Sequence, residues 1–210
     1  HLCAKRIILG MNKPIERQGC FAELVLTPDK NIYELPSNLD IKQAPIAEPT
    51  AVALHAVELG EEVIKKPLDQ SRVLIIGGGA IGLLCALILE KYKKCKEIVL
   101  VDPNEKRLKV CGDHLNSETF KPDSLSIKDS SFDVVFDTVG LEITRQNSIK
   151  SVNSGGVIIH IGLTQPSGTF NFRKATLQEV TFVGTYCYTN NDFENTLKLL
   201  SNHTLGKLEW

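Results

Sequence analysis

The stretch "SRVLIIGGGAIGLLCALILEKY" (residues 71–92) decides the fold, because a short apolar run breaks into three consecutive glycines and then continues as a longer apolar segment. Arg72–Ile76 is rich in Val, Ile and Leu, which is the composition of a strand covered on both faces of a parallel sheet. Ile81–Tyr92 is long enough for a buried helix. We therefore predict a tight turn between a strand and a helix at the glycines.

The glycines of this turn follow the pattern G-x-G-x-x-G. The first permits the tight turn, the second lets the backbone approach a pyrophosphate, and the third allows the helix to pack closely on the strand. The start of the helix offers unpaired N–H groups and a positive dipole end to phosphates. The pattern alone also suits a turn without a ligand, or an FAD site, although flavoproteins usually carry it near their N-terminus. We predict dinucleotide binding by Gly77, Gly79, Ala80, Ile81 and Gly82.

An acidic residue indicates which dinucleotide is bound. Asp102 ends the next predicted strand, Glu97–Val101, and lies about 20 residues after Gly82, where a carboxylate hydrogen-bonds the adenosine ribose. Such a carboxylate accepts from the 2′-OH of NAD and repels the 2′-phosphate of NADP. Arg107 either stacks on the adenine or is a solvated helix residue, and the sequence leaves both open. The predicted cofactor is NAD.

Strand and helix patterns continue to alternate after residue 102. We expect strands at Phe132–Phe136, Val157–Ile161 and Val180–Tyr188, with a short one near Glu118–Phe120, and helices at Glu105–Cys111 and Leu141–Val152. A last helix in "NDFENTLKLLSN" has Asn190 or Asn191 as its expected N-cap and Phe193, Leu197 and Leu200 on one face. This order predicts an α/β fold with a doubly wound parallel sheet, a Rossmann domain.

The first 45 residues have a different pattern. "GCFAELVLTPDKNIYELPSN" (19–38) contains two short β-like runs separated by a Pro-Asp turn. "IAEPTAVALHAVELG" (46–60) then predicts a helix beginning at Pro49, since proline is tolerated in a first helical turn. We therefore expect a β-rich domain over residues 1–45 and the Rossmann domain over 46–210.

Composition excludes several classes of function. The formal net charge of -1 argues against a nucleic-acid or membrane-surface binder. No apolar run reaches the roughly 18 residues of a membrane span, and the N-terminus has no signal-peptide pattern. Six cysteines without a CxxC spacing suit a reducing, cytoplasmic setting, with Cys85 in a buried helix and Cys187 in a strand-like run. Because the chain starts with His, we expect a piece of a longer protein.

Five motifs, in order along the chain, resemble the medium-chain dehydrogenase superfamily, specifically its zinc-dependent alcohol and polyol branch, which includes sorbitol dehydrogenase. They are "GCFAELVLTP", "IAEPTAVALHAV", "VLIIGGGAIGLL", "FDVVFDTVG" and "SGGVIIHIGL". The resemblance implies that residues 1–45 are the C-terminal part of a β-rich, GroES-like catalytic domain. It also implies that the backbone meets the nicotinamide and its ribose at Val139, Gly140, Ile161, Gly162 and Leu163.

The same resemblance implies zinc in the full-length protein. Glu48 matches an acidic residue beside the catalytic zinc, although it could instead stabilise the N-terminus of its own helix. Cys3 matches the last of four cysteines around a structural zinc, which one cysteine cannot hold alone. The family's main zinc ligands and its proton relay are expected upstream of residue 1. His55 and His160 are expected to be packing residues.

The leading hypothesis is an oxidoreductase that transfers a hydride between NAD and a secondary alcohol, such as a polyol or sugar alcohol. Zinc would act as a Lewis acid in the full-length protein, and the fragment alone is expected to be inactive. The alternatives are a zinc-independent reductase of the quinone or enoyl type and a non-enzymatic NAD-sensing module. The resemblance also implies a homodimer or homotetramer joined through the edge strand near residues 180–188, unless that strand is covered within one chain.

Overall fold

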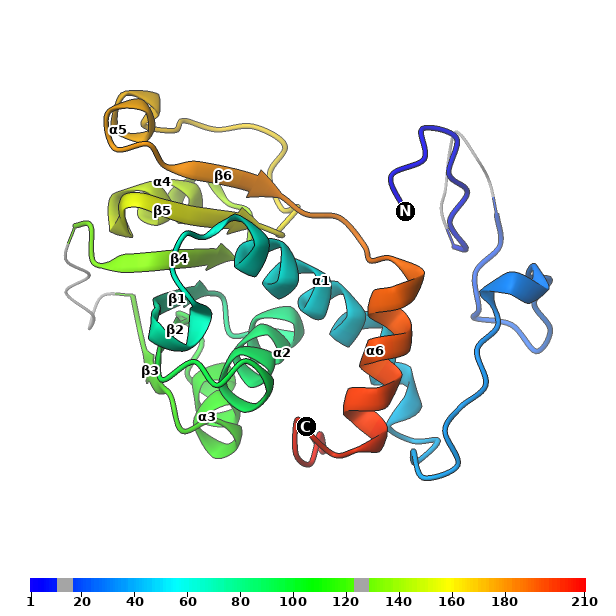
Figure 1. Cartoon of the computed structure of the whole chain (residues 1–210). Coiled ribbons are helices and arrows are strands. Elements are labelled where there is room, and N and C mark those ends of the chain that lie inside the picture. Colours follow the sequence, from blue (N-terminus) through cyan, green and yellow to red (C-terminus); the bar gives the residue numbers. More distant parts are fainter. Residues whose placement is uncertain (11–16, 123–128) are drawn as a thin grey trace.

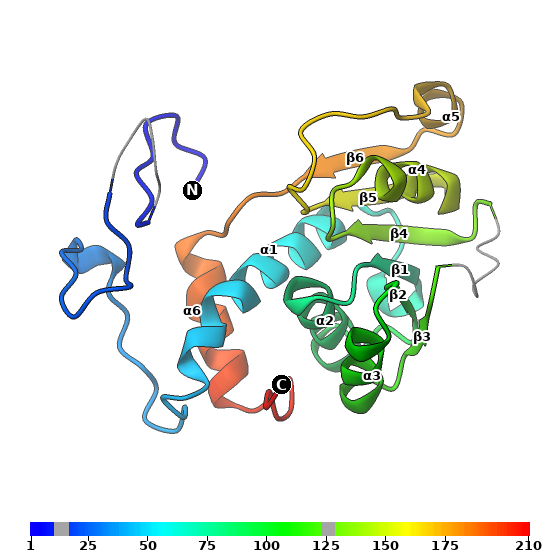
Figure 2. The same ribbon diagram turned by 180° about the vertical axis from the view of Figure 1, so that it is seen from behind.

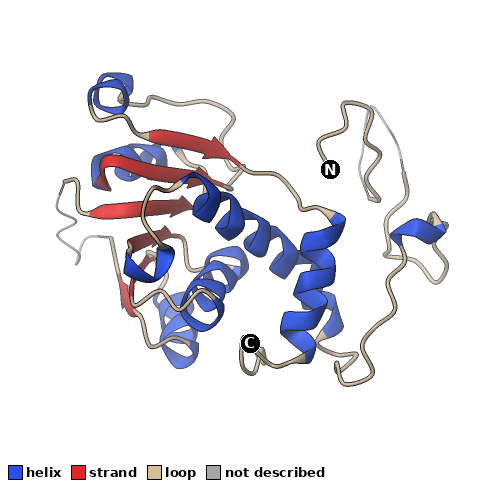
Figure 3. Cartoon of the chain, in the orientation of Figure 1, coloured by secondary structure: helices blue, strands red, loops and turns tan. Residues whose placement is uncertain are grey.

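The computed structural model describes residues 1–10, 17–122 and 129–210, and these build one parallel sheet with helices on both of its faces (Figures 1 and 3). The strands are β1 Arg72–Ile76, β2 Glu97–Val101, β3 Glu118–Phe120, β4 Phe132–Asp137, β5 Val152–His160 and β6 Thr181–Gly184, in the order β3-β2-β1-β4-β5-β6. The helices are α1 Ala47–Val63, α2 Ala80–Leu87, α3 Glu105–His114, α4 Glu142–Ser151, α5 Phe172–Leu177 and α6 Asn190–Ser201. The predicted doubly wound sheet is confirmed.

Alternating strand residues feed two separate hydrophobic cores. Ile75 of β1 lies beside Leu100 of β2 and Phe136 of β4, and all three are fully buried on the face covered by α1 and α2. Leu74 points to the opposite face, where it packs in a cluster with Ile149 of α4. Figure 2 shows α4 and α5 on that second face. Both faces of the central strands are therefore covered, which explains their continuous apolar composition.

Helix α6 is packed against α1 and is held there by a buried contact between a histidine and an aspartate. The Nδ1 atom of His55 lies 2.9 Å from Oδ2 of Asp192, and both residues are buried. Asp192 also accepts a hydrogen bond from the N–H of Thr189, whose hydroxyl accepts from the N–H of Asp192. The N-cap is therefore Thr189, and the predictions of Asn190 or Asn191 were wrong because this reciprocal capping box starts the helix one residue earlier.

Other predicted boundaries also differ, and β5 begins at Val152 rather than at the expected Val157. Helix α1 begins at Ala47 rather than Pro49, because the first helical amides need no partner and the proline fits two residues inside the helix. Strand β6 ends at Gly184, although Val180–Tyr188 was expected to be extended. Its ladder with β5 stops where β5 itself ends, and the chain then turns away through Cys187, which has a φ of 55°. Helix α5 was not predicted.

Prediction along the sheet was more accurate elsewhere. The helix expected at Ile81–Tyr92 is α2 extended by a π-helical turn, Ile88–Tyr92, and α3 runs one turn beyond the expected Cys111. The short strand near Glu118–Phe120 is confirmed as β3. Residues 123–128, within the weakly periodic region that follows it, lie outside the described residues. No helix in the described ranges is both long and apolar enough to cross a membrane.

The two β-like runs expected between residues 19 and 38 do not form strands. The described part of residues 1–45 contains 3-10 turns at Asp29–Asn31 and Ala44–Ile46 and otherwise irregular chain. Figure 1 shows this segment, in blue, beside α6 and away from the sheet. The side chains of Phe21, Leu24 and Leu26 are exposed. A strand needs a hydrogen-bonded neighbour, and none of the described residues supplies one here, so an apolar β pattern alone was not sufficient.

The cysteines divide between the core and the surface. Cys85, Cys95 and Cys111 are buried, whereas Cys3 and Cys20 are exposed. Burial raises the pKa of the Cys85 thiol to about 12 and those of Cys95 and Cys111 to about 11. Cys187 lies in the loop after β6 and not, as expected, in a strand.

Candidate functional site

The sheet order creates a switch point between β1 and β4, where the chain leaves the two strands toward opposite faces. Gly77 follows β1 with a φ of +108°, and a Cβ there would lie 2.5 Å from the hydroxyl oxygen of Thr138, the residue after β4. That hydroxyl donates a 2.9 Å hydrogen bond to the carbonyl of Ile76. The two strand ends are therefore fixed together at the place where α/β sheets bind ligands.

The other two glycines of the motif have opposite surroundings. A Cβ at Gly82 would lie 1.8 Å from the carbonyl oxygen of Gly77, so α2 packs against the turn at a distance that only glycine allows. A Cβ at Gly79 would meet no heavy atom of the described residues within 4 Å. Gly79 is also the N-cap of α2, where Ala80 is exposed. The backbone at the start of α2 is therefore open to an anionic group.

Asp102 joins this turn through its carboxylate. The residue is buried, its Oδ2 accepts a 2.8 Å hydrogen bond from the N–H of Gly78, and its Oδ1 accepts a 2.7 Å bond from the N–H of Asn104. Nη1 of Arg107 lies 3.5 Å from Oδ2, while most of the arginine side chain is exposed. The structure thus brings Asp102, Arg107 and the glycine turn together, as the motif predicts. These residues fit the needs of an NAD site: amide donors at the start of α2 beside a carboxylate acceptor.

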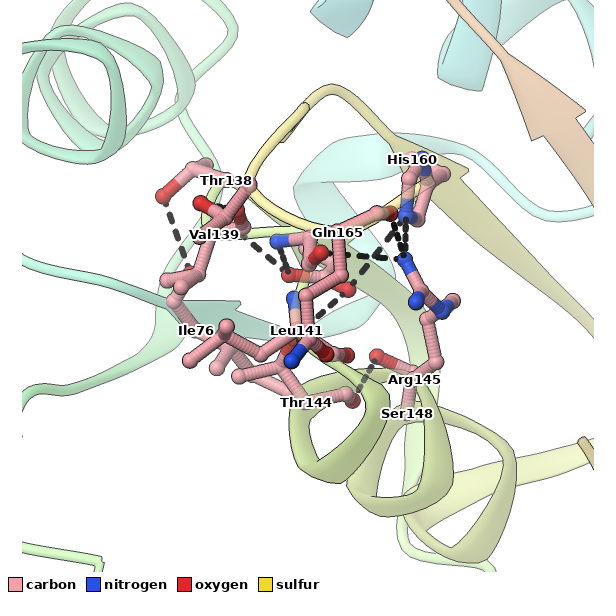
Figure 4. A network of polar contacts seen from close by, with 12 residues as sticks. Ile76, Thr138, Val139, Leu141, Thr144, Arg145, Ser148, His160 and Gln165 are labelled. Atoms are coloured by element: carbon pink, nitrogen blue, oxygen red, sulfur yellow. Dashed lines mark hydrogen bonds and ion pairs between the residues drawn. The ribbon is translucent and has the colours of Figure 1, made fainter. Parts of the chain in front are cut away.

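A second carboxylate, which the sequence analysis missed, organises the end of β4. Asp137 is fully buried, and its Oδ1 accepts hydrogen bonds of 3.0 and 2.9 Å from the N–H groups of Val139 and Gly140. Its Oδ2 accepts a 3.0 Å bond from the hydroxyl of Thr144 in α4 (Figure 4 shows Thr144). An aspartate at the last position of the apolar run "FDVVFD" was the available signal, because an acid in a buried strand must be hydrogen-bonded.

The loops that follow β4 and β5 lie backbone against backbone. A Cβ at Gly140, where φ is +76°, would lie 2.1 Å from the carbonyl oxygen of Gly162. The hydroxyl of Thr164 donates a 2.6 Å bond to the carbonyl of Val139, and the N–H of Gln165 donates a 3.0 Å bond to that of Gly140. Ile161 is half-buried beside this contact, whereas Leu163 is exposed. The two loops that the family resemblance places at the nicotinamide are therefore adjacent.

Arg145 of α4 spans both loops. Its Nη1 donates to the carbonyls of Gly140 at 3.0 Å and Gln165 at 3.1 Å; Figure 4 labels Arg145 and Gln165. Its Nη2 donates to the carbonyl of Ser167 at 2.5 Å. Nη1 also lies 3.4 Å from Nε2 of His160. Burial lowers the pKa of His160; nearby Asp137 opposes that effect and Arg145 adds to it. A guanidinium has donors only, so Nε2 can accept from Arg145 only when His160 is neutral. The same Nε2 lies 3.7 Å from Oδ2 of Asp137.

Glu48 lies apart from these loops, in the first turn of α1. Its carboxyl is partly desolvated, which raises its pKa, and the hydrogen bond from Tyr188 partly offsets that rise. Burial and the neighbouring Glu48 raise the pKa of Tyr188 to about 12. Cys3 is exposed. The described residues contain no group of three or more His, Cys, Asp or Glu side chains able to share a metal ion. A zinc ion therefore does not fit these residues alone, and we derive no reaction step through one.

A parallel sheet of this order, with a glycine turn at its switch point and an acidic residue after the neighbouring strand, defines a Rossmann-type domain. Comparison with family models narrows this class: residues 80–202, more than half of the chain, match the model described as "Zinc-binding dehydrogenase". The chain belongs to this family.

Individual relatives are similar to this chain over nearly its whole length. Probable D-xylulose reductase A of Neosartorya fischeri is 26% identical over 88% of this chain and 53% of its own. The crystal structure of L-idonate 5-dehydrogenase from Escherichia coli has a TM-score of 0.82 at 23% identity and covers 92% of this chain and 55% of its own. Acetophenone reductase from Geotrichum candidum, solved in complex with NAD, has a TM-score of 0.83 at 20% identity, with coverages of 97% and 57%. The chain spans about half the length of these relatives.

Proposed function

We propose that the chain is the NAD-binding part of an oxidoreductase that transfers a hydride between NAD and a secondary alcohol, such as a polyol or sugar alcohol. The observation that carries the proposal is the buried Asp102 carboxylate, hydrogen-bonded to the N–H of Gly78 within the glycine turn. Membership of the zinc-binding dehydrogenase family supports the reaction class. The names of the relatives, a xylulose reductase and an idonate dehydrogenase, support small hydroxylated substrates.

The proposed cofactor contacts follow the order of the strands. The glycine turn and the start of α2 would hold the pyrophosphate, with the residues Gly77, Gly79, Ala80, Ile81 and Gly82. Asp102 would accept from the adenosine ribose hydroxyls, and Arg107 would flank the adenine. The backbone of the paired loops would meet the nicotinamide and its ribose, with the residues Val139, Gly140, Ile161, Gly162 and Leu163. NAD itself, once bound, supplies the hydride chemistry.

Most of the residues that carry out the catalytic step would belong to other parts of the whole protein. We propose that residues 1–45 are the end of a β-rich catalytic domain and that residues 46–210 form the NAD-binding domain. The exposed apolar side chains Phe21, Leu24 and Leu26 support this division, because such side chains are normally covered by a neighbouring part of a domain. Glu48 and Cys3 are this chain's proposed contributions to zinc sites whose other ligands come from the whole protein.

The proposal extends to assembly and location. β6 is an edge strand, and Phe182 on it is about half exposed, which supports pairing of two β6 strands across a two-fold axis in a homodimer or homotetramer. The six cysteines without a CxxC spacing support a reducing cytoplasm.

Calorimetric titration of the chain with NADH and with NADPH tests the cofactor assignment. We expect NADPH to bind at least tenfold more weakly, equivalent to about 1.4 kcal/mol, because its 2′-phosphate would meet the Asp102 carboxylate. Asp102→Asn should reduce this preference, whereas Asp113→Asn, a change at an exposed position of α3, should leave it intact. Equal affinities for the two dinucleotides, or no binding of either, would contradict the proposal.

A further inference from the structure

Among the residues that the structure describes, no carboxylate is hydrogen-bonded to Arg145, although it is a charged residue on a helix next to the proposed cofactor site. Its guanidinium donates to three backbone carbonyls, those of Gly140, Gln165 and Ser167. The first belongs to the loop after β4 and the other two to the loop after β5. One side chain therefore links two loops that leave neighbouring strands.

The contact between the loops depends on hydrogen bonds because it contains almost no side chains. At Gly140 and Gly162 the two backbones approach so closely that a Cβ on either would clash. Asp137 holds the first loop to its own strand through the amides of Val139 and Gly140. The backbone carbonyl of Asp137 also accepts hydrogen bonds from the N–H groups of Ile161 and Gly162, so the start of the second loop is held to the same residue. Beyond Gly162 the second loop is exposed.

Past that point the remaining connections to the first loop are few. Thr164 donates to Val139 and Gln165 donates to Gly140, and Arg145 then adds its bonds to Gln165 and Ser167. The planar guanidinium offers five N–H donors in a fixed arrangement, which a lysine ammonium cannot reproduce.

We propose that Arg145 is a positioning residue: it holds the loops after β4 and β5 in the one arrangement that receives the nicotinamide half of NAD. The inference rests on the proposed function and names a determinant of cofactor geometry within it. Within the described residues, Arg145 makes no hydrogen bond to the glycine turn or to Asp102. The glycine turn has contacts of its own, from the hydroxyl of Thr138 at the start of the loop after β4 and from the carboxylate of Asp102.

This separation makes the role measurable. NADH and ADP-ribose share the adenosine and the pyrophosphate, but ADP-ribose has no nicotinamide. Loss of Arg145 should therefore weaken the binding of NADH and leave the binding of ADP-ribose unchanged. We expect Arg145→Gln to reduce the affinity for NADH about tenfold, the scale of one charged hydrogen bond, with ADP-ribose unchanged within about twofold. Arg145→Lys should bind NADH little better than Arg145→Gln does, because a lysine cannot donate to the same carbonyls at once.

Isothermal titration of the full chain with both ligands performs the test, with Arg173→Gln as the control, since Arg173 is an exposed arginine of α5. Thr164→Val removes a single hydroxyl contact between the same loops and should lower the affinity for NADH, but not for ADP-ribose, by a smaller factor. This variant keeps the proposal testable if Arg145→Gln does not fold. Equal losses for both ligands, or no change in either, would overturn the positioning role. Failure of the unmodified chain to bind either ligand would instead overturn the proposed function.

Discussion

The two parts of the proposed cofactor site are built in different ways. The glycine turn after β1 is made by neighbours in sequence: Gly77 and Gly82 touch within a single strand–helix junction. The paired loops after β4 and β5 are made by residues far apart, since Arg145 reaches Gln165 and Ser167. Both parts contain close glycine contacts, but the turn holds its shape within one strand–helix junction, whereas the second part also needs a side chain that joins two loops. A substitution should therefore affect the two parts differently.

The largest effect is expected at the glycine turn. Gly82→Val would place side-chain atoms where the carbonyl of Gly77 lies, 1.8 Å from the new Cβ, so α2 must move away from β1. Binding of both NADH and ADP-ribose should fall by at least about 100-fold, equivalent to roughly 2.7 kcal/mol, and the thermal midpoint should drop. Titration and thermal unfolding measure the two effects.

Gly79→Ala is the matched control, because its Cβ meets no described heavy atom within 4 Å. This variant should fold like the unmodified chain and still lose both ligands, since the new methyl group would face the pyrophosphate. A Gly82→Val chain that binds ADP-ribose normally would show that the close approach of α2 is not needed.

The next effect, on stability rather than on ligand binding, is expected at Asp137. Asp137→Ala leaves the N–H groups of Val139 and Gly140 without their acceptor, which should lower the free energy of unfolding by about 2–4 kcal/mol. Chemical denaturation measures this loss. Thr144→Ala removes one of the three donors and should cost about 1 kcal/mol. If the two variants were equally stable, Asp137 would not be the organising group of the loop.

The smallest effect is a dependence on pH through His160. Burial lowers the folded-state pKa of this histidine below its ordinary value, so between the two values the unfolded chain binds more protons than the folded chain. Stability should therefore fall as the pH falls below about 6.5, the ordinary pKa of histidine. The free energy of unfolding, measured by denaturation at several pH values across this range, should depend less on pH in His160→Gln than in the unmodified chain. An identical slope in both proteins would assign the acid sensitivity to other groups.

The sequence predicted the part of the site that follows a known spacing of residue types. The strand at Arg72–Ile76, the turn after it and Asp102 could be placed because spacing alone defines them. Arg145 could not be found, because its partners are backbone carbonyls, which carry no residue signature, and they lie up to 22 residues away.

The fold was predicted unevenly for the same reason. Buried strands such as β4 follow from their composition, and even β3, with three residues, was located. The length of β6 depends on where β5 stops, and the segment from 19 to 38 depends on a partner strand that the described residues do not supply. Thr189 was missed as a cap because two asparagines beside it are equally good candidates by residue type.

The distribution of the cysteines has a practical consequence for labelling. Thiolates are the reactive form, so the raised pKa values of Cys85, Cys95 and Cys111 make the core thiols slow to alkylate while the chain is folded. Cys3 and Cys20 are exposed in the N-terminal segment. A fluorophore maleimide would therefore attach there first and act as a reporter for anything that docks on that segment. Delayed modification of the core thiols would time the opening of the sheet in the same sample.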